Sequence, residues 1–193
     1  MKEMAYILIS YSLGGIPFAF IITKIISRFD IRTKGSGNVG ATNVLRILGP
    51  LPGILVLILD ILKGFLVIRF APENLLYLSG LAVIAGHCWT PFLKFKGGKG
   101  VATTLGVLAA INLSYLGYAI AAWLIVFLIF KTVSLSSIAA AVILPLILLV
   151  KSESIQVLIF ITFYSAIVIY RHKQNIKRLL DGKEKRIKFK KIK

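Results

Sequence analysis

The sequence predicts an all-α, polytopic integral membrane protein with seven transmembrane helices in one domain, residues 1–193. Hydrophobic residues fill 58% of its 193 positions and charged residues only 16%, whereas soluble domains are about half apolar and about a quarter charged. Apolar runs long enough to cross a bilayer recur along the whole chain. Three polar segments interrupt these runs, and they are the candidate functional regions.

The expected helices follow one another with short connections. The fourth and fifth belong to one apolar stretch, Val101–Phe130, which is too long for one ordinary crossing and has a natural break at Asn112 and Ser114. Basic residues flank both ends of this stretch, so an even number of crossings keeps them on one side of the membrane. The expected spans are Met4–Ile26, Leu48–Phe70, Leu75–Phe92, Val101–Leu113, Tyr115–Phe130, Val133–Val150 and Ser154–Tyr170.

The distribution of positive charge predicts an external N-terminus and a cytoplasmic C-terminus. With seven spans, 20 of the 24 Lys and Arg residues fall on the cytoplasmic side, 11 of them in the tail Arg171–Lys193. A basic tail beside an apolar span is typical of an anchor on anionic lipid. No nucleic-acid-reading motif accompanies the net charge of +17. We therefore expect membrane lipid, and no nucleic acid, as a partner, and an N-terminal span that is retained rather than cleaved.

The first polar segment, Ser36–Arg46, follows the first span, and we call it the first island. Glycines let its backbone fold tightly, and Arg46 presents a planar fork suited to phosphate. A polar, turn-rich loop without a binding role is the alternative interpretation. The further side chains able to hydrogen-bond a ligand here are Ser36, Asn38, Thr42 and Asn43.

The second island, Lys94–Gly100, joins the third and fourth spans. Its glycines permit close approach to an anion, Lys99 supplies charge, and the N-terminus of a helix follows at once. It is not a Walker A loop, because Lys99 is followed by glycine and no strand precedes it, so ATP hydrolysis is not expected. An ordinary positive loop is the alternative. The candidate phosphate contacts are Gly97, Gly98, Lys99, Gly100 and Thr103.

The third island, Arg171–Arg178, follows the last span. His172, Asn175 and Arg178 are spaced three apart, so they form one stripe if the helix continues past Tyr170. These side chains are expected to bind a ligand together, although an interfacial histidine without such a task is also consistent with the pattern.

Three further ionisable residues lie in or near the apolar spans. Asp60 and Lys63 are expected to form a structural ion pair, with a place in the wall of the site as the alternative. His87 lies about a turn before the second island, and packing and function are equally open for it. The sequence contains no nucleophile elbow, no His-x-x-x-x-Asp acyltransferase motif and no metal-ligand cluster, so no metal site is expected.

Taken in order, these segments resemble the bacterial acyl-phosphate:glycerol-3-phosphate acyltransferase family, the PlsY type, over essentially the whole chain. The pattern Asp60…Lys63-Gly64 also fits that family. The resemblance implies an acyl-phosphate site at Gly97–Thr103. It implies important polar roles for Ser36 and Arg46, and it matches the family's third motif to His172, Asn175, Arg178 and Glu184.

The resemblance implies an enzyme of the bacterial cytoplasmic membrane with its active site facing the cytoplasm. It would move a fatty acyl group from acyl phosphate to the 1-hydroxyl of glycerol 3-phosphate, giving lysophosphatidic acid and phosphate without a cofactor. An acyl phosphate is already activated, so direct transfer needs no acyl-enzyme, and either a substrate phosphate or His172 takes the proton. A small anion channel or transporter with a phosphate-binding mouth is the alternative. The sequence predicts neither the acyl-chain preference nor the oligomeric state.

Overall fold

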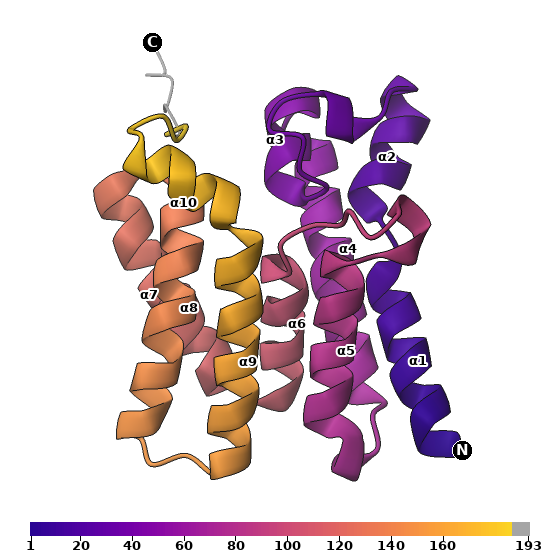
Figure 1. The fold of residues 1–193 in the computed structure, drawn as a ribbon, viewed down its shortest axis with the longest axis vertical. Coiled ribbons are helices and arrows are strands. Elements are labelled where there is room, and N and C mark those ends of the chain that lie inside the picture. The colour runs from indigo at the N-terminus through magenta and orange to yellow at the C-terminus, as the bar shows by residue number, and fades with distance from the viewer. Residues whose placement is uncertain (187–193) are drawn as a thin grey trace. The chain divides into compact units, whose positions relative to one another are not determined.

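A computed structural model describes residues 1–186, and every regular element in that range is a helix. The chain divides into two compact units, Met1–Asn112 and the residues from Leu113 onward. Figure 1 shows the helices of each unit. The end of the predicted basic tail, residues 187–193, lies outside the described residues. The prediction of a single domain therefore stays a prediction.

In the first unit, the apolar helices α1, α4, α5 and α6 run side by side, with α2 and α3 at one end (Figure 1). Helix α1 packs chiefly on α5, and α4 packs on α6 and α3. The α-helices are α1 Lys2–Gly15, α2 Phe18–Ser27, α3 Ala41–Leu48, α4 Pro50–Arg69, α5 Leu76–Cys88 and α6 Val101–Ile111. Short 3₁₀ helices join them: η1 Ile31–Thr33, η2 Glu73–Leu75 and η3 Pro91–Leu93.

Glycines allow the two main helix pairs of the first unit to approach closely. A β-carbon at Gly14 of α1 would meet the carbonyl of Val83 on α5, and one at Gly64 of α4 would meet the carbonyl of Thr103 on α6. Gly86 and Gly106 make the reciprocal approaches from α5 and α6. Small residues serve this purpose between membrane helices, where packing rather than the hydrophobic effect drives association.

The first predicted span is not one continuous helix. We predicted Met4–Ile26, but Ile16 adopts a non-helical conformation (φ −58°, ψ 115°) between α1 and α2. Pro17 is the reason, because it has no N–H to donate and its ring disfavours helical geometry in the residue before it. The break leaves backbone carbonyls at membrane depth that need other partners.

A second difference lies before α4, where the predicted span Leu48–Phe70 began. Helix α4 begins at Pro50, and the part of the first island from Ala41 onward forms the separate helix α3. Gly49 separates the two helices with a φ of +90°. The first island is therefore half loop and half helix.

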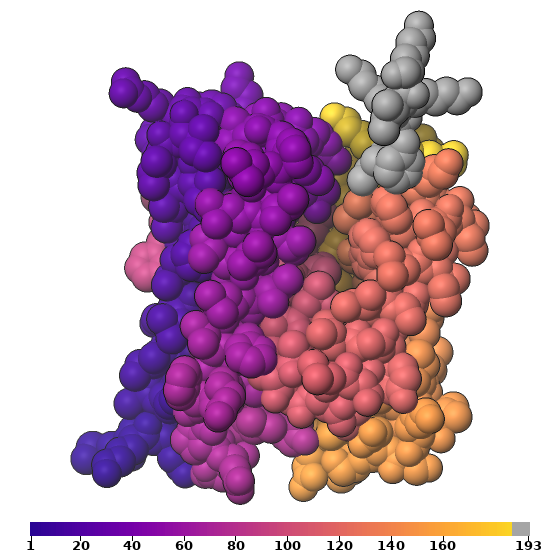
Figure 2. Space-filling model, turned by 180° about the vertical axis from the view of Figure 1, so that it is seen from behind, coloured from indigo at the N-terminus to yellow at the C-terminus, as the bar shows by residue number. Residues whose placement is uncertain are grey.

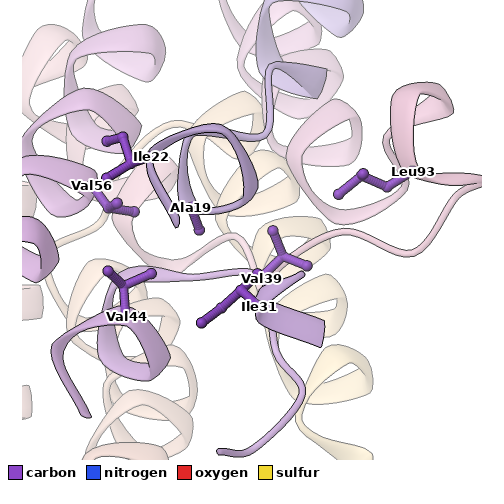
Figure 3. Packing of buried hydrophobic residues seen from close by; sticks show 7 residues of the cluster. All are labelled: Ala19, Ile22, Ile31, Val39, Val44, Val56 and Leu93. Atoms are coloured by element: carbon purple, nitrogen blue, oxygen red, sulfur yellow. The ribbon is translucent and has the colours of Figure 1, made fainter. Parts of the chain in front are cut away.

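A compact apolar cluster lies beneath the first island (Figure 3). It contains Val39 from the island loop and Val44 from α3, and both are almost completely buried. Side chains from α2, η1, α4 and η3 complete it: Ala19, Ile22, Ile31, Val56 and Leu93. This cluster anchors the polar loop to the helices of the first unit.

The second unit contains four helices: α7 Leu113–Phe130, α8 Val133–Val150, α9 Ile155–Arg171 and α10 Lys173–Leu180. Helix α8 packs on both α7 and α9. The break that we predicted at Asn112 is present, since Asn112 is extended (φ −160°, ψ 121°). Ser114, however, lies inside α7.

Within residues 1–186, five segments are long and apolar enough to cross a membrane, or six if the bent pair α9–α10 is one span. Helix α6 is shorter, 11 residues or about 16 Å at about 1.5 Å per residue. The all-helical membrane architecture is thus confirmed, while seven crossings and their orientation stay predictions. On the face shown in Figure 2, the exposed side chains of α4 are mostly leucine and isoleucine, as expected for contact with lipid.

Candidate active site

Asn43 shapes the first island. Its side chain is 1% exposed, and its Nδ2 donates to the backbone carbonyls of Lys34 and Asn38, each at 3.1 Å. Its Oδ1 accepts a 2.9 Å hydrogen bond from the backbone N–H of Ser36. One buried amide therefore holds the loop against the start of α3, a structural task that stands beside the substrate contact predicted for Asn43.

The other polar side chains of the first island are more accessible. Ser36, Thr42 and Arg46 are exposed, while Asn38 is half-buried. Thr42 and Arg46 are four residues apart on α3, so they lie on one face of that helix. The first island thus presents a hydroxyl and a guanidinium on a backbone that Asn43 holds in place.

The second island folds back onto the end of α5. The N–H of Gly97 donates to the carbonyl of Cys88 at 3.2 Å, and the N–H of Gly98 donates to the carbonyl of His87 at 3.0 Å. These two N–H groups therefore satisfy helix carbonyls in this structure. The close approach of an anion that we predicted for these glycines stays a prediction.

Space also requires glycine at both positions. A β-carbon at Gly97 would meet the carbonyl of His87, and one at Gly98 would meet the Nε2 of His87 and the carbonyl of Val39. Because Val39 belongs to the first island, the structure brings the first and second islands together. Both islands line a cavity of about 10 Å³ that also contains Asp60.

The remaining predicted positions of the second island differ in burial. Gly100 is buried with a φ of +83°, where it precedes α6, and Lys99 is half-buried. Thr103 is fully buried on α6, in the close packing against α4. Thr103 therefore lies in the helix interface, and its predicted contact with a substrate stays a prediction.

Asp60 and Lys63 form the expected ion pair, with 2.7 Å between Oδ1 and Nζ. His87 joins it, because its Nδ1 lies 2.8 Å from the Nζ of Lys63. All three side chains are less than 9% exposed. The sequence placed His87 only near the second island; the structure adds that it contacts both that island and the ion pair.

The third island does not continue the last membrane helix. Helix α9 ends at Arg171, and α10 leaves it at an angle of 59°. We predicted one stripe of His172, Asn175 and Arg178 on the condition that the helix continues past Tyr170, and the bend at His172 does not meet that condition. Asn175 and Arg178 share α10, one helical turn apart.

His172 is held by the end of α9. Its ring is 2% exposed, and its Nδ1 lies 2.8 Å from the carbonyl oxygen of Val168. A carbonyl oxygen only accepts, so Nδ1 carries the proton of this hydrogen bond. In the neutral ring the Nε2 atom is then the basic nitrogen, which suits contact with a hydroxyl group.

Glu184 gathers the polar side chains of the second unit. Its Oε1 accepts hydrogen bonds from Asn175 at 2.6 Å and from Ser134 of α8 at 2.7 Å, and its Oε2 accepts from Arg178 at 2.6 Å. Burial alone would raise the pKa of Glu184, but the hydrogen bonds from these three partners outweigh it and lower the pKa. Glu184 is therefore an anion at neutral pH.

Ser134 is a residue that the sequence did not single out. It lies 50 positions from Glu184, and nothing in its local sequence marks it. Among the described residues, no three His, Cys, Asp or Glu side chains gather in a way that suits a metal ion.

The apolar helices define an integral membrane protein. Its candidate site is polar and consists of hydroxyl, amide and cationic groups around two glycine-containing loops. Residues 4–182 match the family model described as glycerol-3-phosphate acyltransferase. A glycerol-3-phosphate acyltransferase of Endomicrobium trichonymphae is 45% identical over 97% of this chain and 96% of its own length. The chain belongs to the glycerol-3-phosphate acyltransferase family.

Solved structures agree with this assignment. The crystal structure of PlsY, an integral membrane glycerol 3-phosphate acyltransferase, in its glycerol 3-phosphate form superposes with a TM-score of 0.92 and 42% identity. The crystal structure of its lysophosphatidic acid form superposes with a TM-score of 0.89 and is 41% identical in sequence. Each comparison covers 97% of this chain and 96% of the other.

Proposed function

We propose that this protein transfers a fatty acyl group from acyl phosphate to the 1-hydroxyl of glycerol 3-phosphate. The hydroxyl oxygen attacks the acyl carbon, the bond from that carbon to the phosphate oxygen breaks, and inorganic phosphate leaves with the bonding electrons. The product is lysophosphatidic acid. The observation that carries the proposal is the family match over residues 4–182, which includes all three islands.

Support for the acceptor and the product comes from the PlsY structures, which are described as glycerol 3-phosphate and lysophosphatidic acid forms. Support for an acyl phosphate donor comes from the sequence. It has no nucleophile elbow and no His-x-x-x-x-Asp motif, so it offers no familiar means of activating a less reactive donor. An acyl phosphate already carries a good leaving group.

The first unit is proposed to bind phosphate groups. Arg46 is exposed and bears a planar fork that suits a phosphate, and Ser36 adds a hydroxyl on the same island. The second island is proposed to bind the donor, with Lys99 as its charged contact. Bringing cations to two anionic substrates lowers their repulsion and favours the transition state.

The second unit is proposed to position the acceptor. Asn175 is fixed by Glu184, and His172 has its Nδ1 occupied by a backbone carbonyl. The proton of the attacking hydroxyl is proposed to pass to a substrate phosphate, since the activated donor does not require full deprotonation before attack. General-base catalysis by the Nε2 of His172 is the competing route.

The protein is proposed to lie in the bacterial cytoplasmic membrane, with seven crossings, an external N-terminus and all three islands in the cytoplasm. The 20-of-24 bias of basic residues supports this orientation. Cysteine substitutions in sealed cells test it. Labelling of a cysteine at Lys96 by a membrane-impermeant reagent from outside would contradict it.

The purified protein tests the activity itself. With acyl phosphate and glycerol 3-phosphate present, we expect phosphate release that depends on both substrates. A channel or transporter would instead move an anion across sealed vesicles without consuming acyl phosphate, and that result would replace the enzyme assignment.

A further inference from the structure

Two charged side chains and a histidine lie together inside the first unit. Lys63 and Asp60 are one turn apart on α4, and His87 reaches them from α5. Their exposed fractions are 7%, 2% and 8%. Ionisable groups at such a depth in a membrane protein are costly, and they usually have a functional task.

Lys63 makes one ion pair and two hydrogen bonds. Its Nζ lies 2.7 Å from the Oδ1 of Asp60, 2.8 Å from the Nδ1 of His87 and 3.2 Å from the carbonyl oxygen of Ile16. The carbonyl of Ile16 is available because Pro17 breaks the helix just after it. The ammonium thus ties together α4, α5 and the break between α1 and α2.

This arrangement selects one tautomer of His87. An ammonium group has no lone pair, so the Nδ1 of His87 must accept the hydrogen bond from Lys63. The ring proton of the neutral histidine is therefore on Nε2. The Oδ1 of Asp60, at 3.5 Å from Nδ1, is too distant to compete with Lys63.

The Nε2 atom of His87 points toward both islands of the first unit. A β-carbon on Gly98 would meet this atom and, beside it, the carbonyl oxygen of Val39. The cavity at this place has a volume of about 10 Å³, which is room for about one water molecule. Asp60 and His87 line this cavity together with both islands, so we place the role of the three side chains in the arrangement of the loops around it.

We propose that Asp60, Lys63 and His87 form a positioning relay for the two islands. Asp60 fixes Lys63, Lys63 fixes the ring and tautomer of His87, and the Nε2–H edge of His87 sets how the Gly98 backbone lies against Val39. This proposal rests on the proposed function, in which the second island binds the donor. None of the three residues is a catalytic residue, because each acts through the loops.

The first experiment observes the tautomer. The chain contains only two histidines, so the full-length protein labelled with ¹⁵N-histidine in detergent gives two sets of ring signals, and the His172→Asn variant identifies those of His87. We expect His87 to show a protonated Nε2 and an unprotonated Nδ1. We expect the Asp60→Leu/Lys63→Met double variant, which removes both charges of the pair, to change this pattern. An Nδ1-protonated ring in the native protein, or a pattern unchanged in the double variant, would overturn the relay.

The second experiment separates positioning from stability. Replacing one partner alone leaves an uncompensated buried charge and endangers folding, whereas replacing a buried ion pair with apolar residues is often neutral for stability. The Asp60→Leu/Lys63→Met double variant should therefore retain the melting temperature. We expect its KM for acyl phosphate to rise about tenfold. A tenfold change corresponds to the loss of about 1.4 kcal/mol of binding free energy.

Tyr6→Phe is the matched control. It removes a hydrogen bond between α1 and α4, from the Tyr6 hydroxyl to the carbonyl of Val67, and touches neither island. Its KM should stay at the native value. A double variant that is as stable as the native protein and has native KM values would show that the ion pair does not position the islands and would refute the proposal. Failure of the native protein to use acyl phosphate would instead refute the proposed function and leave the tautomer result intact.

Discussion

Gly98→Ala tests the junction of the two islands. The added methyl group would meet the Nε2 of His87 and the carbonyl oxygen of Val39. His87 cannot move aside freely, because Lys63 holds its other ring nitrogen at 2.8 Å. The Gly98 backbone cannot move freely either, because its N–H bonds the carbonyl of His87.

Overpacking of this kind costs about 1–3 kcal/mol. For a chain of this size that corresponds to a decrease in melting temperature of about 2–12 °C. Because the strain falls on the loop that is proposed to bind the donor, we also expect a higher KM for acyl phosphate and a smaller change for glycerol 3-phosphate.

Thermal unfolding in detergent and steady-state kinetics measure both effects. Gly117→Ala of α7 is the control, because a β-carbon there meets nothing within 4 Å and alanine favours the helix. It should unfold at or above the native temperature. Native stability in Gly98→Ala would mean that the second island does not pack against His87 as described, and a kinetic effect confined to glycerol 3-phosphate would reassign the loop to the acceptor.

Four further predictions concern single side chains. Arg46→Ala should retain its melting temperature, because Arg46 is exposed, and its kcat/KM should show a loss of about 1.5–3 kcal/mol or more of transition-state binding. Arg46→Lys should recover little of this loss, because lysine lacks the planar fork. Full activity in either variant would contradict the phosphate contact. Asn43→Leu should lower stability by about 1–3 kcal/mol, since it leaves loop carbonyls without their donor; an unchanged melt would contradict this. The lowered pKa of Glu184 contributes stability that is present above the ordinary pKa of a glutamate and is lost as pH falls through the lowered pKa. The melting temperature should therefore decrease less steeply toward acid pH in Glu184→Gln than in the native protein. The same decrease in both proteins would refute the lowered pKa of Glu184. His172→Asn should keep measurable turnover if a substrate phosphate takes the proton. A decrease in turnover of about a hundredfold or more, with the disappearance of one pKa from the pH–rate profile, would establish His172 as the base.

Long uninterrupted helices were predictable from sequence. The expected spans Val133–Val150 and Ser154–Tyr170 agree with α8 and α9 to within a residue at each end, because apolar length and flanking charges define such helices. The break at Pro17 was also visible in the sequence, but the apolar run through it concealed its effect on the helix.

The candidate site was predictable in its residue types and not in its contacts. Glycine marked the first two islands, and asparagine marked the first. The sequence could not show that Asn43 serves the loop backbone or that Gly98 faces His87. These contacts depend on how each loop folds back on itself or on a helix end, and the contact between Ser134 and Glu184 joins positions 50 apart in the chain. Local patterns predict helices and turns, whereas such pairs depend on how the helices pack.

The central claim is that acyl phosphate is the donor and that its acyl group passes directly to glycerol 3-phosphate. Purified protein supplied with equal concentrations of acyl phosphate, acyl-CoA or acyl carrier protein ester, each with glycerol 3-phosphate, tests it in one assay of both products. We predict lysophosphatidic acid and inorganic phosphate in equal amounts from acyl phosphate, and no lysophosphatidic acid from the two thioesters. Lysophosphatidic acid formed from a thioester, or phosphate released from acyl phosphate without lysophosphatidic acid, would contradict the account.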